Sequence, residues 1–129
     1  ALRAALHLAS LAPAPQTTQQ IAEATQVSPT YLAKVLQALG RAGIVISQRG
    51  LHGGVALARD PRAIMVLEVV SAVEPIERIE QCPLGLAAHA EQLCPLHRKL
   101  DDAIAGIRSA FGATSVADLI EAPGTVLPR

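Results

Sequence analysis

The chain has 129 residues, and its 11 Lys and Arg balance 11 Asp and Glu, so the formal net charge is zero. This length is enough for one domain that buries a hydrophobic core. There are 24 alanines but one Tyr and one Phe. This composition favours helices over a β-sandwich or barrel, because Ala loses almost no side-chain entropy in a helix.

Membrane and secreted proteins are disfavoured. No apolar run approaches the ~20 residues that span a bilayer, and we find no secretory leader. Two cysteines are too few for a disulfide framework, which favours a reducing compartment. We therefore expect a cytoplasmic protein that makes no membrane contact.

The charges are distributed unevenly along the chain. Residues 1–63 have six basic and two acidic side chains, whereas residues 64–129 have five basic and nine acidic ones. A basic half beside an acidic half is typical of a polyanion-binding protein with a separate interaction element.

Two helix-start signals predict a helix-turn-helix. Thr17 stands three residues before Gln20, which is a capping-box pattern for the start of a short helix. Ser28 as N-cap and Pro29 at the first helical position predict a second helix, which ends at Gly43. A short segment separates the two helices, as the helix-turn-helix motif requires.

A β-hairpin is predicted directly after this motif. Residues 44–48 are β-branched and apolar, residues 55–58 predict a return strand, and the segment 49–54 between them is rich in glycine. A basic hairpin after a helix-turn-helix is a wing, and residues 65–73 predict a helix that packs back on the core. The expected fold is therefore mainly α with a small β-hairpin wing.

This winged helix-turn-helix predicts binding to double-stranded DNA. The major groove accepts one α-helix, whose N-terminal residues contact base edges. A lysine one turn further along suits a phosphate, and an arginine on a wing suits a narrow minor groove of negative potential. The candidate DNA-binding residues are Ser28, Pro29, Thr30, Tyr31 and Lys34 on the helix and Gln48, Arg49, Gly50, His52, Gly53 and Gly54 on the wing.

Two alternatives to this interpretation stay open. In the first alternative, the module is a winged helix that contacts other proteins and does not bind DNA. For Tyr31 alone, a place in the amphipathic core is the alternative to a base contact.

Residues from 96 onward predict a long helix with one apolar stripe. Apolar residues recur there every three or four positions, and they are Leu96, Leu100, Ile104, Ile107 and Phe111. The other face holds charged residues, namely Arg98, Lys99, Asp101, Asp102 and Arg108. Thr114 and Ser115 then cap a last short helix through Ile120.

Several segments carry a family resemblance in their order along the chain. The most specific is the wing from Arg49 to Ala58, and the others are residues 1–6, 20–22, 28–32, 36–43, 66–74 and 114–119. These segments resemble the Rrf2 family of bacterial winged-helix transcriptional regulators. The resemblance implies a regulator, acting as a repressor, that binds a palindromic operator as a homodimer with one half-site for each subunit.

The resemblance also implies a division of the chain into three units. Residues 1–74 would form the winged helix-turn-helix domain, residues 75–95 a sensor loop with the cysteines, and residues 96–129 the dimerisation helix with the last short helix. The apolar stripe would then contact a second subunit. The alternative is that the long helix packs within its own subunit as part of the core.

The two cysteines precede the long helix. Cys82 and Cys94 match the first and third cysteines of the cluster-binding members of the family, whereas Ala88 stands at the middle position. His97 follows Cys94 by three residues, and His can replace Cys at a cluster iron. The resemblance thus implies iron–sulfur ligands at Cys82, Cys94 and His97, with His89 as a substitute for the missing thiol. Two alternatives stay open, a redox-active thiol pair and a purely structural role.

The motifs of common enzyme classes are absent from the sequence, and we expect no enzymatic activity. The glycines of the wing tip lie on a hairpin and not between a strand and a helix, so they form no phosphate loop. Neither a Gly-x-Ser-x-Gly elbow nor a His-Glu-x-x-His pair occurs. The cysteines are too far apart in sequence for a typical thiol oxidoreductase. A thiol or metal enzyme built on this fold remains as a third hypothesis.

Overall fold

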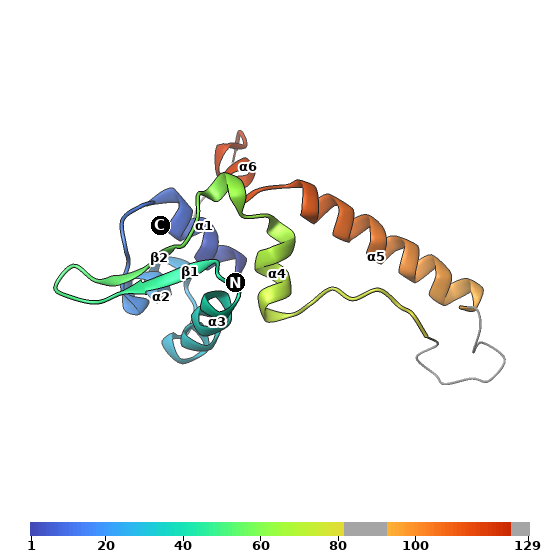
Figure 1. Ribbon diagram of the computed structural model, residues 1–129, viewed down its shortest axis with the longest axis horizontal. Helices are drawn as coiled ribbons and strands as arrows, with labels where there is room; N and C mark the ends of the chain where they lie inside the picture. The colour runs from blue at the N-terminus through green and yellow to red at the C-terminus, as the bar shows by residue number, and fades with distance from the viewer. Residues whose placement is uncertain (82–92, 125–129) are drawn as a thin grey trace.

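The computed structural model describes residues 1–81 and 93–124. Its elements, in chain order, are α1 (Leu2–Ser10), α2 (Thr18–Thr25), α3 (Pro29–Arg41), β1 (Val45–Gln48), β2 (Gly54–Leu57), the 3-10 helix η1 (Pro61–Ala63), α4 (Val66–Val73), α5 (Pro95–Ala113) and α6 (Val116–Glu121). The first four helices, the hairpin and α6 form a body from which α5 extends as an arm (Figure 1). The structure thus has the predicted helical fold with one antiparallel hairpin.

The predicted caps position α2 and α3. The Thr17 hydroxyl accepts a hydrogen bond from the Gln20 N–H at 3.1 Å, and the Gln20 side chain accepts one from the Thr17 N–H at 2.8 Å. Ser28 accepts a hydrogen bond from the Tyr31 N–H at 3.3 Å. Between the helices Gln26 has a left-handed φ of 55°, which ends α2 and turns the chain toward α3.

The core lies between the helices of the body. Its largest fully buried side chains come from all parts of the body, and they are Leu8, Ile21, Leu32, Leu39, Ile44, Ile64, Val69 and Val116. Each contributes about 1.5–3 kcal/mol by leaving water. After α5 the chain returns to this core, because the Val116 N–H donates to the Ile64 carbonyl and the Val66 N–H donates to the Thr114 carbonyl, both at 2.8 Å.

The segment 74–81 lies along α5 and is held there by polar contacts. The Arg78 guanidinium contacts both carboxylate oxygens of Asp101, at 2.7 and 2.6 Å, and the Ile79 N–H donates to the same carboxylate at 2.9 Å. Arg108 donates to the Ile76 carbonyl. Asp101, which the sequence placed on the charged face of the long helix, is only 8% exposed because of these contacts. The helical pattern could not show its partner, which lies 23 residues earlier.

No helix within residues 1–81 and 93–124 is both long and apolar enough to cross a membrane.

The Asp101 contacts predict a pH-dependent stability. The hydrogen bonds from the Arg78 side chain and the Ile79 N–H lower the pKa of Asp101 from 3.8 to about 2. Because the folded-state pKa is the lower one, these contacts stabilise the fold above pH 3.8 and are lost as the pH falls toward 2. We expect Asp101→Asn to lower the free energy of unfolding at pH 7, by a margin that shrinks as the pH falls below 4.

Urea unfolding of both proteins, followed by circular dichroism across this pH range, measures that margin. Asp102→Asn is the matched control, because it removes the same charge from an exposed neighbour on α5. A margin for Asp101→Asn that stays constant from pH 7 to pH 3 would contradict the prediction.

Candidate nucleic-acid interface

The start of α3 presents its polar side chains to solvent. Ser28, Thr30, Tyr31 and Lys34 are all exposed, whereas the apolar residues on the opposite side of the helix are buried, namely Leu32, Val35, Leu36 and Leu39. Tyr31 is 56% exposed, so the alternative that places it in the core is wrong. This arrangement leaves the first turns of α3 free to enter a major groove.

The wing is a short hairpin whose tip is tightly constrained. In the register of β1 and β2, Gln48 lies opposite Gly54. Gly50 has a φ of +112°, and a Cβ added at Gly53 would lie 2.4 Å from the Gln48 carbonyl oxygen. Glycine is therefore required at both positions. Of the predicted wing residues, Gln48, Arg49, Gly50 and His52 are exposed at this tip, and Gly53 and Gly54 are half-buried at its return.

The second strand of the wing, β2, is joined to the chain that precedes α2. The Gln16 N–H donates to the Val55 carbonyl at 2.8 Å, and the Val55 N–H donates to the Gln16 carbonyl at 2.7 Å. A Cβ at Gly54 would lie 2.5 Å from the Gln16 carbonyl oxygen, so the two backbones approach this closely because Gly54 has no side chain. A groove lined by Ala33, Gln37, Ile46, Ser47 and others then separates α3 from the hairpin.

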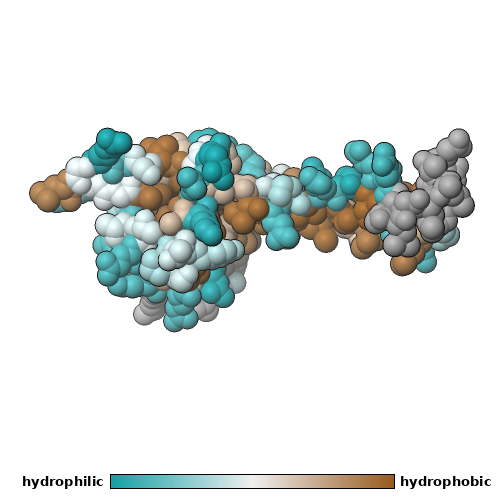
Figure 2. All heavy atoms as spheres, turned by 90° about the horizontal axis from the view of Figure 1, so that it is seen from below, coloured by the Kyte–Doolittle hydropathy of each residue, from teal (hydrophilic) through white to brown (hydrophobic). Residues whose placement is uncertain are grey.

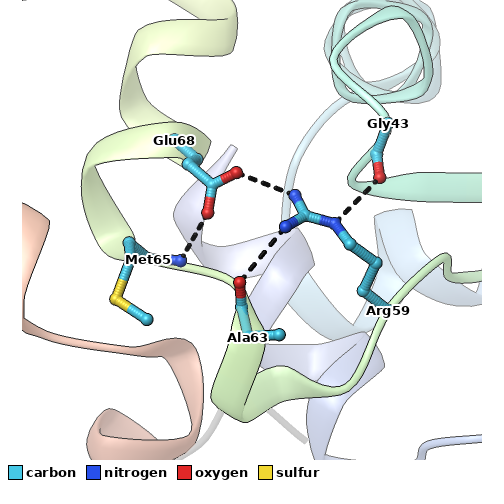
Figure 3. Close-up of polar contacts among 5 residues, drawn as sticks. All are labelled: Gly43, Arg59, Ala63, Met65 and Glu68. Carbon is cyan, nitrogen blue, oxygen red and sulfur yellow. Dashed lines mark hydrogen bonds and ion pairs between the residues drawn. The ribbon is translucent and has the colours of Figure 1, made fainter.

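Arg59 links the hairpin to the rest of the body (Figure 3). Its guanidinium donates to the Gly43 carbonyl at 3.4 Å, to the Ala63 carbonyl at 3.1 Å and to the Glu68 carboxylate at 2.8 Å. Glu68 also accepts a hydrogen bond from the Met65 N–H at 2.9 Å. That backbone hydrogen bond and, after it, the Arg59 contact lower the pKa of Glu68. Arg59 is one of the six basic residues of the first half of the chain, but its partners lie within the fold.

The apolar stripe of α5 faces outward along part of the arm. Leu96, Leu100 and Ile107 are 72%, 50% and 44% exposed, and Ile104 and Phe111 are half-buried. Figure 2 shows the hydrophobic surface that follows one side of the arm. The alternative that the whole stripe packs within one subunit does not fit this exposure, which large apolar residues of a monomer rarely show in a row.

Cys94 and His97 lie at the far end of the arm. The Cys94 Sγ atom is 3.0 Å from His97 Nδ1 and also accepts a hydrogen bond from the His97 N–H at 3.5 Å, which makes Cys94 the N-cap of α5. A separation of three residues at the start of a helix brings the two side chains together. Cys82 and His89 lie outside the described residues.

The donor set fits part of a metal site. Within residues 1–81 and 93–124 no group of three or more His, Cys, Asp or Glu side chains could hold a metal ion. Thiolate and imidazole are suitable ligands for an iron–sulfur cluster, and Cys94 and His97 offer one of each. The described residues thus include two of the three predicted ligands, Cys94 and His97.

An exposed helix-turn-helix followed by a glycine-built wing defines the class of winged helix-turn-helix DNA-binding proteins. Residues 1–122 match the family model Rrf2, which is described as an iron-dependent transcriptional regulator. The chain belongs to the Rrf2 family, as its sequence segments predicted. It is a transcriptional regulator with a DNA-binding winged-helix fold.

Solved structures and a curated relative agree with this assignment. CymR of Bacillus subtilis, the global cysteine regulator, is 27% identical with a TM-score of 0.75, and the match covers 92% of this chain and 88% of that one. IscR of T. potens is 25% identical with a TM-score of 0.74, covering 92% and 79%. The protein named "Putative HTH-type transcriptional regulator" from Aquifex aeolicus (strain VF5) is 29% identical, covering 79% of this chain and 73% of the relative.

The comparisons also bear on two further predictions. The family and these neighbours are transcriptional regulators and not enzymes, as the sequence predicted. The family includes members that bind iron–sulfur clusters, which leaves the cofactor of this chain as a proposal.

Proposed function

We propose that this regulator is a repressor that binds a palindromic DNA operator as a homodimer. The residues at the start of α3 contact bases in the major groove, Lys34 contacts a phosphate, and Arg49 enters the adjacent minor groove. The observation that carries the proposal is the exposure of the candidate residues on α3 and at the wing tip, while the buried sides of the same elements fix their positions. A purely structural winged helix has no need for an exposed arginine and histidine on a glycine-built tip.

DNA titrations with two variants test this assignment. Arg49→Ala should cost about 1–3 kcal/mol on an operator, as loss of a specific groove contact does. Lys34→Ala should weaken binding to all sequences similarly and flatten the dependence of log Kd on log salt concentration, because one phosphate contact is lost. Duplexes selected by the wild-type protein from a random-sequence pool serve as operator, and an unselected duplex serves as the nonspecific probe.

Lys99→Ala is the matched control, since it removes one exposed positive charge from α5, outside the winged helix. It should bind both probes as the wild type does. Wild-type affinity for both Arg49→Ala and Lys34→Ala would refute the proposed interface. A wild-type protein that shows no salt-dependent binding to any duplex would instead favour the protein-contact module.

The homodimer is supported by the apolar stripe of α5. The segment 74–81 covers α5 at Asp101 through the Arg78 contact, so the polar contacts are satisfied within the subunit. Leu96, Leu100 and Ile107 remain exposed. A second α5 packed on this stripe would bury these side chains in both subunits by the same contacts, as a two-fold interface requires.

Ile107→Asp tests the dimer. A carboxylate in an apolar interface is costly, so we expect the dimer to weaken about 100-fold or more, while an exposed position in the monomer leaves the subunit folded. Operator affinity should fall with it, because two half-sites no longer bind as one unit. Light scattering at micromolar concentration and circular dichroism measure assembly and fold.

Ser109→Asp is the matched control. It places the same charge on α5 two residues further along, about 200° around the helix from Ile107 and exposed. It should remain a dimer. A wild-type protein that is monomeric at micromolar concentration would refute the proposed assembly.

We further propose that the sensor loop and the start of α5 bind an iron–sulfur cluster through Cys82, Cys94 and His97. Such a cluster supplies one-electron redox chemistry. Support comes from the family, whose model is described as iron-dependent, and from the adjacent Cys94 and His97 side chains. Because Cys94 is also the N-cap of α5, the residue that binds the cluster would also fix the start of the dimerisation helix.

Anaerobic reconstitution followed by iron and sulfide analysis tests the cluster. Cys94→Ser is the informative variant, because serine is a good N-cap but replaces the thiolate ligand. The wild type should take up iron and sulfide in equal amounts, whereas Cys94→Ser should take up little and keep its helical circular dichroism. Equal iron and sulfide uptake by both proteins would remove Cys94 from the ligand set, and no uptake by the wild type would refute the cluster.

A further inference from the structure

We propose that Leu51, at the tip of the wing, is an apolar wedge that enters the DNA minor groove and partly unstacks one base step. The proposal rests on the DNA-binding function proposed above and adds a residue to it. Leu51 is not a hydrogen-bonding or charged residue, and the polar contacts of the interface do not involve it.

The exposure of Leu51 is the first observation. Leu51 is 95% exposed, the highest value among the large hydrophobic residues in the part of the chain that the structure describes. The other exposed ones are at most 72% exposed. Figure 2 shows hydrophobic surface at the outermost end of the hairpin, apart from the rest of the body. Packing within the subunit therefore gives no reason for a leucine at this position.

The constrained tip is the second observation. The Gly53 N–H donates to the Gly50 carbonyl at 3.0 Å, so the two glycines close a tight turn around Leu51 and His52. A Cβ at Gly53 would lie 2.4 Å from the Gln48 carbonyl oxygen, so glycine allows the chain to fold back this closely. Because the backbone around Leu51 is already fixed, inserting the side chain into a groove costs little additional conformational entropy.

The charge beside Leu51 identifies the occupant as DNA. Arg49 and His52 are both exposed at the same tip, and the minor groove has a negative potential that attracts such side chains. Leucine is one of the apolar residues that minor-groove proteins insert between base steps. A neutral apolar pocket on a protein partner would offer no negative charge to Arg49. Such a pocket therefore fits this tip less well than DNA does.

Unstacking is easiest at pyrimidine–purine steps such as TA and CA, which are flexible. Removal of the Leu51 side chain from water on insertion favours binding. The wing therefore prefers such a step at its position in the operator, even where no hydrogen bond to a base edge is made. This preference is a specificity term separate from the base contacts of α3.

The test uses duplexes selected by the wild-type protein from a random-sequence pool. A hydroxyl-radical footprint locates the minor groove that the wing protects, and 2-aminopurine is placed in turn at each step there, because its fluorescence rises on unstacking. The wild type and Leu51→Met, which keeps a long apolar side chain, should both raise the fluorescence at one step. Leu51→Ala should raise it at none and bind roughly tenfold more weakly.

Two further variants make the result specific. Leu11→Ala shortens another exposed leucine, 41% exposed and outside the hairpin, and should behave as the wild type. Arg49→Ala tests the wing itself in the same duplex. If Arg49→Ala loses affinity while Leu51→Ala binds and unstacks as the wild type, the wedge is refuted and the proposed function stands.

The remaining outcomes also test the wedge or the proposed function. Weaker binding by Leu51→Ala without any wild-type rise in 2-aminopurine fluorescence shows a groove contact without unstacking, and refutes the wedge. No binding by the wild type to any duplex refutes the proposed function together with the wedge. Folding is not in question for Leu51→Ala, because its side chain makes so little contact with the subunit, and a thermal melt checks this.

Discussion

The DNA-binding half of the molecule depends on one backbone contact, the pair of hydrogen bonds between Gln16 and Val55. A hairpin of two four-residue strands is only marginally stable alone, and these bonds give β2 a second backbone neighbour besides β1. Gln16 directly precedes the cap of α2, and α2 packs against α3. The position of the wing relative to α3 is therefore fixed through Gln16 and α2. Gly54 is the residue that permits this contact, since any side chain there would meet the Gln16 carbonyl.

The sequence predicted the elements whose causes are local. The Thr17–Gln20 capping box, the Ser28 cap and the apolar spacing of α3 and α5 each follow from residues within a few positions of one another. Contacts between distant segments left no such pattern. The helical spacing placed Asp101 on the charged face of α5 but did not indicate its partner, because Arg78 belongs to an irregular segment with no periodicity. The sequence also did not indicate the partners of Arg59, since they lie in three separate parts of the chain, namely the loop after α3, η1 and α4.

The two faces of α5 explain how one helix can serve both its own subunit and a second one. The polar face is used within the subunit, where Asp101 and Arg108 hold the segment 74–81. The apolar stripe is left for the proposed partner. A helix held by packing alone would need the same apolar residues for both tasks. Because polar contacts hold the segment 74–81 against α5, the arm keeps its position in the monomer while Leu96, Leu100 and Ile107 remain exposed.

A series of contacts connects the proposed cluster site at Cys94 with α3 and the wing. Cys94 caps one end of α5, and at the other end Gly112 faces the Leu67 side chain of α4. One residue along α4, Glu68 holds Arg59, and Arg59 holds the Gly43 carbonyl at the junction of α3 and the wing. In the proposed mechanism, a change in the position of α5 would reach α3 and the wing through these packed or hydrogen-bonded neighbours. A difference of ~1–3 kcal/mol between two such seatings is enough to change operator affinity several-fold or more. Because the wing is also fixed by Gln16, that energy would act on the placement of the whole winged helix in the proposed dimer, and not on the wing alone.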